Sequence, residues 1–127
     1  MQNIIDTKKE LSAFKRAKSF VHAGRGIKVF IKTTPNARIQ LVVFFLMAIL
    51  GFYFHITNIE WIMFIFASGL VLVTEALNTA IEIDINLTSP GYHPYARDTK
   101  DVAAGAVLIS AIVAVIIGVM IFGHYIF

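Results

Sequence analysis

Three polar side chains, those of Glu75, Asn78 and Glu82, interrupt the apolar stretch "VTEALNTAIEIDIN" at residues 73–86. On an α-helix their spacing of i, i+3 and i+7 places them on one face. Carboxylates can accept a proton from an alcohol or hold a hard cation, and an amide can orient a polar substrate. This stretch is therefore the first candidate for chemistry in the chain.

Glu75 and Glu82 would lie at different depths in a membrane, and this difference predicts different roles for them. The apolar segment ahead of them begins at Trp61, a residue type favoured at membrane interfaces. Glu75 would lie about 21 Å and Glu82 about 31 Å beyond Trp61, across a hydrocarbon layer about 30 Å thick. A carboxylate at the depth of Glu75 could take the proton of a lipid alcohol. Glu82, at the cytoplasmic edge, could hold a cation.

A purely structural role is the alternative for the same side chains. A carboxylate inside a membrane span costs about 3 kcal/mol on insertion scales, so such groups usually have a partner or a task. Glu75 and Asn78 could serve only to join helices by hydrogen bonds. Asp84, at i+9 from Glu75, is expected on the opposite face as a solvated or structural carboxylate, whereas Asn86 returns to the face of Glu75.

The composition favours an integral membrane protein of the all-α class. Of the 127 residues, 57% are hydrophobic and only 15% are charged, and a soluble fold of this size could not bury so much apolar surface. Cysteine is absent, which excludes disulfides and thiolate chemistry. Three transmembrane helices are predicted, the first two forming a hairpin around Asn58. Their approximate bounds are residues 38–57, 59–86 and 97–123.

The distribution of positive charge predicts the orientation. Nine of the eleven Lys and Arg residues lie at or before Arg38, and the other two lie in the stretch 86–101. Because short cytoplasmic loops carry an excess of Lys and Arg, the N-terminus and this later loop are predicted in the cytoplasm and the C-terminus outside. A basic segment could also suggest nucleic acid, but beside membrane spans it is interpreted as an anchor to anionic lipid. No nucleic-acid partner is expected.

The N-terminal segment has apolar residues near helical spacing with basic residues between them. This pattern predicts a cytoplasmic N-terminus with an amphipathic surface helix over residues 1–34, broken around Gly24 and Gly26. Pro35 then marks a turn into the first span. Residues 35–127 are predicted as the three-helix transmembrane domain.

The loop "NLTSPGYHPYARDTKD", residues 86–101, carries further polar groups at the cytoplasmic mouth. Arg97 and Asp101 are i and i+4 if the last helix begins that early, which predicts a surface ion pair. Lys100 could contact phosphate. No Walker-type "GxxxxGK[ST]" occurs and "GRGIKV" lacks the third glycine of GxGxxG, so a nucleotide would be bound without a known Gly-rich loop.

The segments "EALNTAIE", "SPGYHP" and "KDVAAGAVL", in this order and spacing, resemble the prokaryotic diacylglycerol kinase family, which includes undecaprenol kinases. The resemblance implies a homotrimeric enzyme of the bacterial cytoplasmic membrane, with active sites shared between subunits. Such an ATP-dependent lipid kinase transfers the γ-phosphate of Mg²⁺-ATP to a membrane lipid alcohol. Undecaprenol is slightly favoured over diacylglycerol as the acceptor, because two of the segments look like the Gram-positive branch.

The resemblance also assigns roles to single residues. Glu75 matches the general base, and Glu82 matches a carboxylate that binds the metal. The implied ATP-binding residues are Lys15, His22, Glu82, Tyr92, His93, Lys100 and Asp101. The implied lipid-substrate residues are Asn36, Arg38 and Asn78.

Two positions depart from the family pattern. Thr34 stands where the family usually has a Glu that is a second metal ligand, and Asn86 stands where it has an Asp. Both changes remove negative charge near the expected Mg²⁺. The alternative is therefore a weakened or inactive family member that binds lipid or nucleotide. A small transporter or assembly subunit with Glu75 as a proton or ion relay is a further alternative, disfavoured because the segment 61–73 offers no polar path beyond Ser68 and its neighbouring glycine.

Overall fold

The computed structural model describes all 127 residues and is entirely helical. Its helices are α1 (Gln2–Thr33), α2 (Pro35–Phe54), α3 (Asn58–Thr88) and α4 (Pro94–Ile126). The chain divides into two compact units, Met1–Thr33 and Thr34–Phe127. The second unit holds three helices that are long and apolar enough to cross a membrane, which confirms the prediction of three spans in an all-α chain.

Helix α1 runs without interruption, so the predicted break around Gly24 and Gly26 is wrong. A glycine inside a helix costs about 1 kcal/mol relative to alanine, which weakens the helix without ending it. No residue of α1 is buried within its own unit. The helix ends at Thr33, and Thr34 has an extended backbone (φ −117°, ψ 95°) because the ring of Pro35 disfavours a helical conformation before it.

Helices α2 and α3 form the predicted hairpin, with a connection of three residues, 55–57. His55 ends α2 in the left-handed conformation (φ 53°), and its N–H bonds to carbonyls of the last turn. Helix α3 begins with a capping box, in which Thr57 and Glu60 each bond to the backbone N–H of the other. Asn58 is therefore the first helical residue of α3 rather than the centre of the turn.

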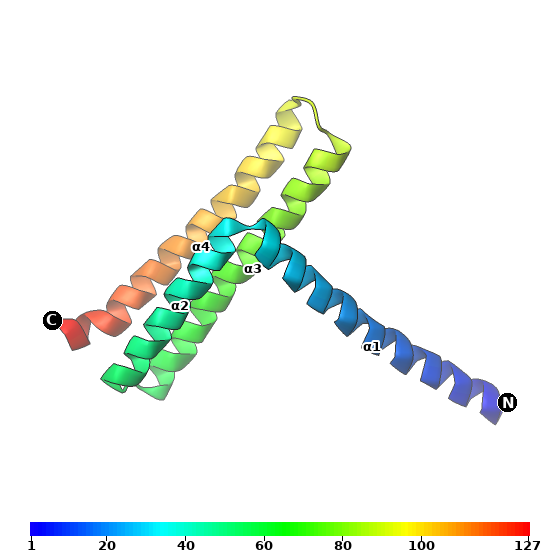
Figure 1. The fold of residues 1–127 in the computed structure, drawn as a ribbon, viewed down its shortest axis with the longest axis horizontal. Helices are drawn as coiled ribbons and strands as arrows, with labels where there is room; N and C mark the ends of the chain where they lie inside the picture. Colours follow the sequence, from blue (N-terminus) through cyan, green and yellow to red (C-terminus); the bar gives the residue numbers. More distant parts are fainter. The chain divides into compact units, whose positions relative to one another are not determined.

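Helices α3 and α4 lie side by side along their length, and α2 lies against the earlier part of α3 (Figure 1). Helix α3 continues to Thr88 and α4 begins at Pro94, so much of the predicted loop 86–101 is helical. Proline is suited to the first turn of a helix, where its missing N–H leaves no bond unmade. The hydroxyls of Thr74 and Ser110, 2.7 Å apart, join α3 to α4 near mid-length.

The ends of α3 and α4 opposite the 89–93 loop are joined by a second polar contact. The Tyr125 hydroxyl donates to Glu60 Oε1 at 2.7 Å, and Nε2 of His124 lies 3.1 Å from Glu60 Oε2. An apolar cluster packs beside them, formed by Ile56, Ile121 and Phe122. These contacts fix the end of the bundle that is remote from the polar face of α3.

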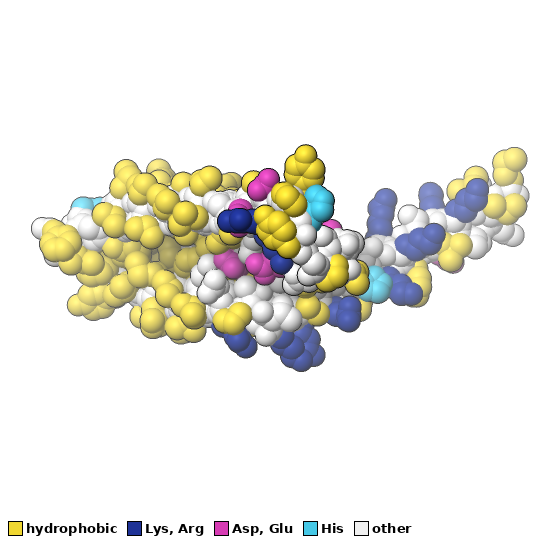
Figure 2. Space-filling model, turned by 90° about the horizontal axis from the view of Figure 1, so that it is seen from above, with side chains coloured by type: hydrophobic (Ala, Val, Ile, Leu, Met, Phe, Trp, Pro, Cys, Tyr) yellow, Lys and Arg dark blue, Asp and Glu magenta, His cyan; other side chains and the backbone are white.

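On the face of α2, α3 and α4 that Figure 2 shows, large apolar side chains cover most of the surface, and acidic and basic side chains of these helices gather over a limited part of it. The core is correspondingly thin, because few side chains of these helices are buried. In a membrane such a surface faces lipid or other helices, and close packing and polar contacts rather than hydrophobic burial select the helix arrangement.

Candidate functional site

The carboxylate of Glu75 is buried in the bundle, with 3% of the residue exposed. Its hydrogen-bond donor is Gln40 of α2, whose Nε2 lies 3.2 Å from Glu75 Oε2. A buried carboxylate of this kind has lost its hydration and has no Lys or Arg partner in its place. The only side-chain hydrogen bond to the Glu75 carboxylate therefore comes from a neutral amide.

One turn further along α3, Thr79 meets Thr34 at the start of α2. The two hydroxyl oxygens lie 2.8 Å apart, and both residues are buried. Thr34 is the N-cap residue of α2, yet its side chain makes no capping bond to that helix. The hydroxyl that stands where the resemblance implied a carboxylate is therefore used to join α2 to α3.

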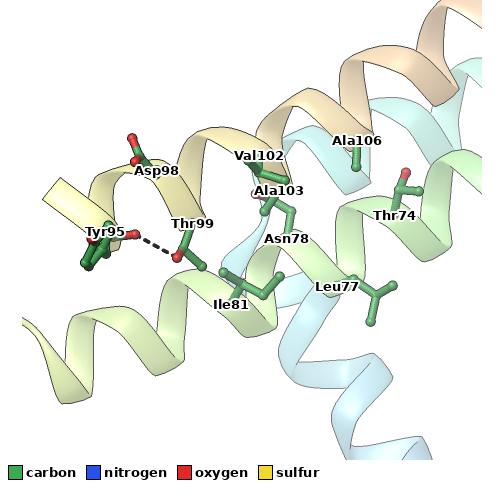
Figure 3. A pocket seen from close by; sticks show the side chains of 10 residues that line it. All are labelled: Thr74, Leu77, Asn78, Ile81, Tyr95, Asp98, Thr99, Val102, Ala103 and Ala106. Carbon is green, nitrogen blue, oxygen red and sulfur yellow. Dashed lines mark hydrogen bonds between the residues drawn. The ribbon is translucent and has the colours of Figure 1, made fainter.

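Asn78 faces the neighbouring side of α3 and lines an open pocket of about 530 Å³ between α3 and α4 (Figure 3). Side chains of both helices complete the lining: Thr74, Leu77 and Ile81 of α3 and Tyr95, Asp98, Thr99, Val102, Ala103 and Ala106 of α4. The Oδ1 atom of Asn78 is buried and has no hydrogen-bond partner. Such an oxygen requires a donor, so this atom can take a hydrogen bond from a bound molecule.

A second groove runs along α2, α3 and α4 and has a volume of about 480 Å³. Its lining is almost wholly apolar, with Gln40 and Ser68 as the polar exceptions and Phe122 near the far end. Gln40 therefore touches both the groove and the Glu75 carboxylate. An apolar chain in this groove would have its polar end beside Gln40.

Glu82 is exposed and lies one turn beyond Thr79 on α3. No cluster of three or more His, Cys, Asp or Glu side chains occurs in the structure. Mg²⁺ keeps several waters and commonly takes one or two carboxylates together with substrate phosphates. One exposed carboxylate therefore fits a nucleotide-bound Mg²⁺ and does not form a metal site on its own.

At the open end of the bundle, Lys100 of α4 contacts Asn86 of α3. The Nζ atom donates to Asn86 Oδ1 at 2.7 Å, and both residues are exposed. Because the acceptor is a neutral amide, this contact orients the ammonium group without neutralising it. Arg97 and Asp101 form the predicted i, i+4 ion pair at 3.8 Å, with both side chains largely in solvent.

Residues 89–93 and the start of α4 surround a shallow pocket of about 260 Å³. Tyr92, His93, Lys100 and Asp101 all line it, so the structure brings together four of the residues expected at the nucleotide. His93 has an additional local task, because its Nδ1 accepts the N–H of Tyr95 and caps α4. Tyr92 is 80% exposed and free to meet a ligand.

Asn36 and Arg38 lie in the first turns of α2 with exposed side chains. Lys15 and His22 are exposed on α1, in the first unit. Sequence reasoning missed Gln40 and Thr79, the direct partners of Glu75 and Thr34. The sequence does contain a signal for Gln40, which is the lone amide in "RIQLVV", one turn inside an apolar span. An amide without a hydrogen-bond partner is as unfavourable there as the polar side chains of α3 are in their span.

Comparisons with known proteins give a consistent result. The family model described as prokaryotic diacylglycerol kinase matches residues 21–122. An undecaprenol kinase of Bacillus subtilis is 40% identical over 92% of this chain and 94% of that protein. A diacylglycerol kinase of Synechocystis is 38% identical over 79% of this chain and 58% of that protein. A diacylglycerol kinase of Helicobacter pylori is 30% identical over 88% of this chain and 85% of that protein.

Proposed function

Because the chain belongs to the prokaryotic diacylglycerol kinase family and is an ATP-dependent lipid kinase of a bacterial membrane, we propose that its acceptor is undecaprenol. Support comes from the relative named undecaprenol kinase, which aligns along nearly its whole length with this chain. The apolar groove that ends at Gln40 also suits a long hydrocarbon chain with a single terminal hydroxyl. Diacylglycerol is the competing acceptor.

The observation that carries the mechanism is the burial of Glu75 beside a neutral donor. In the proposed reaction Glu75 accepts the proton of the lipid hydroxyl as that O–H bond breaks. The hydroxyl oxygen forms a bond to the γ-phosphorus, and the bond between the γ-phosphorus and the β–γ bridging oxygen breaks to release ADP. Such catalysis depends mostly on positioning and electrostatics, so few reactive side chains are needed. Asn78 and the exposed Asn36 and Arg38 would hold the lipid headgroup.

The nucleotide would bind at the open end of α3 and α4. Lys100 would offset phosphate charge, and Tyr92, His93 and Asp101 line the same pocket. The family resemblance assigns ATP contacts to Lys15 and His22 as well, and both side chains are exposed on α1. Glu82 would supply a protein ligand to Mg²⁺, which neutralises phosphate charge when bound with ATP.

The proposed assembly is a homotrimer with active sites shared between subunits. In the proposed orientation, the Lys- and Arg-rich residues 1–38 and the 89–93 loop lie on the cytoplasmic side of the membrane. The thin core supports further copies of the chain against the exposed helices. The Lys and Arg distribution supports the orientation, which leaves the C-terminus outside. Helix α1 would lie in the cytoplasmic interface, with exposed Phe14 and Phe20 in the lipid and its basic residues at the headgroups.

The direct test is transfer of labelled γ-phosphate from ATP with Mg²⁺ to undecaprenol and to diacylglycerol, each in mixed micelles. Glu75→Gln is expected to lower transfer by at least about 10²-fold, the usual contribution of a general base. Asp84→Asn is the matched control, because it changes an exposed carboxylate of the same helix and should leave transfer unchanged. Preference for diacylglycerol would overturn the proposed acceptor, and absence of transfer from folded protein would favour the inactive family member.

A further inference from the structure

Gln40 of α2 is the side chain that connects the buried carboxylate of Glu75 to the apolar groove. Its Nε2 donates to Glu75 across 35 residues of sequence, at 3.2 Å. Its other amide atom, Oε1, is buried and has no hydrogen-bond partner. An unsatisfied buried acceptor is unfavourable by about 1–3 kcal/mol. The Oε1 atom of Gln40 is therefore expected to accept a hydrogen bond in another state of the protein.

The chemistry of the partner determines what the carboxylate can do. A Lys or Arg in this position would neutralise Glu75 and, having only donors, could not bond to its protonated form. A second carboxylate would repel the charged form. An amide offers a donor and an acceptor on one rotatable group, so it can bond to either protonation state of its neighbour.

We propose that Gln40 is a positioning residue for the reaction, holding Glu75 in place before and after proton transfer. Before transfer, Nε2 donates to the Glu75 carboxylate, as in the structure. After Glu75 has taken the proton of the lipid hydroxyl, the amide turns over and Oε1 accepts the new O–H. The unpartnered Oε1 is thereby used in the second state. The inference rests on the proposed role of Glu75 as the general base.

The buried surroundings make this control of geometry necessary. The hydroxyl of Thr79, one turn away on the same face, is hydrogen-bonded to that of Thr34, and the hydroxyl of Thr74 is hydrogen-bonded to that of Ser110. No other side chain donates to the Glu75 carboxylate. Without Gln40, the carboxylate would lose its only side-chain hydrogen bond, and the distance to a substrate hydroxyl would no longer be fixed.

Three variants separate hydrogen bonding from packing. Gln40→Met keeps the length and removes both hydrogen-bonding atoms, and Gln40→Glu keeps the shape but offers acceptors only when it is ionised. Gln40→His retains one donor and one acceptor on its ring. We expect kcat to fall about 10- to 100-fold in Gln40→Met, the loss typical of a hydrogen bond to a charged group, with the KM for ATP unchanged. Gln40→Glu should be at least as slow, while Gln40→His should recover most of the loss.

The kinetic outcome decides between positioning and packing. Wild-type kcat in Gln40→Met would overturn the inference, as would a Gln40→His variant as slow as Gln40→Met. Turnover of the wild type together with loss in Glu75→Gln establishes the base independently, so a failure of Gln40 is distinguishable from a failure of the proposed function.

A spectroscopic measurement tests Gln40 even if no acceptor lipid is phosphorylated. The infrared carboxylate band of Glu75 is identified as the band that disappears in Glu75→Gln. It should shift in Gln40→Met relative to the wild type and return toward its position in Gln40→His. An unshifted band in Gln40→Met would show that the amide does not hold the carboxylate, and would overturn the inference.

Discussion

The hydroxyl oxygens of Thr34 and Thr79 lie 2.8 Å apart in the buried contact between the start of α2 and the middle of α3. The family resemblance implied a carboxylate at position 34, directed at a metal. In this chain the same position instead joins two helices, and the carboxylate nearest to it along α3 is Glu82, one turn beyond Thr79. The substitution thus exchanges a potential metal ligand for a structural hydrogen bond.

The threonine pair should behave as a unit in stability measurements. Thr34→Val or Thr79→Val alone leaves one buried hydroxyl unpaired and should lower the free energy of unfolding by about 1–3 kcal/mol. The double variant replaces both partners by apolar groups of the same shape and should lie near the wild type. Unfolding of the micellar protein by a denaturing detergent measures all three. Simple additivity of the single effects would show that the two hydroxyls are not coupled.

A carboxylate at position 34 should change the metal requirement. Thr34→Glu brings a second carboxylate toward Glu82, and the added attraction of about 1 kcal/mol should lower the Mg²⁺ concentration for half-maximal activity about fivefold. The same variant should be less stable without metal and regain stability as Mg²⁺ is added. Thr34→Gln, of equal length and no charge, is the control. An identical Mg²⁺ dependence in both variants would contradict the expectation.

The neutral contact between Asn86 and Lys100 predicts an effect on ATP affinity. Asn86→Asp would pair the ammonium of Lys100 with a negative charge, and an exposed pair of this kind is worth at most about 1 kcal/mol. The KM for ATP should therefore rise up to about fivefold at low salt, with a smaller effect at high salt because the pair is screened. Asn86→Ala should show no such rise. A lower KM for ATP in Asn86→Asp would mean that the added charge acts on the metal instead.

The hairpin of α2 and α3 should be sensitive to one methyl group. A Cβ atom at Gly51 would lie 2.8 Å from Cη2 and 2.9 Å from Cζ2 of the Trp61 ring. Gly51→Ala therefore forces the rigid ring to move and should cost about 1–3 kcal/mol of stability, as overpacking usually does. Gly69→Ala, in α3 of the same hairpin, meets no atom within 4 Å and serves as the control. Equal unfolding midpoints of the two variants would contradict this reading of the contact.

The spans could be predicted because length and apolar composition are sufficient to identify a helix that crosses a membrane. The last span was predicted from about residue 97, whereas α4 begins at Pro94, because proline favours the first helical turn. The ion pair of Arg97 and Asp101, expected only if the helix began this early, is present. The break in α1 was wrong, because two glycines weaken a helix without ending it.

The partners of the polar residues could not be predicted in the same way. Helical spacing places Glu75 and Asn78 on one broad face, but it does not say which helix each side chain meets. In the structure Glu75 accepts a hydrogen bond from Gln40 of α2, whereas Asn78 lines the pocket between α3 and α4. Gln40 is not part of a set of polar residues at helical spacing on α2. Its contact with Glu75 becomes visible only when α2 is packed against α3.

Each hydrogen bond between side chains of different helices has one partner on α3. Those to α2 involve Thr79 and Glu75, and those to α4 involve Glu60, Thr74 and Asn86. The two contacts to α2 lie between Thr74 and Asn86 of the α4 set, so the rotation of the helix is fixed from two directions at once. A single residue inserted into or deleted from α3 turns everything beyond it by about 100°. Single residues of α3 can therefore be substituted without changing the direction of the others. A change in the length of α3 between Glu60 and Asn86, in contrast, would misdirect Glu75, a contact to α2 or a contact to α4.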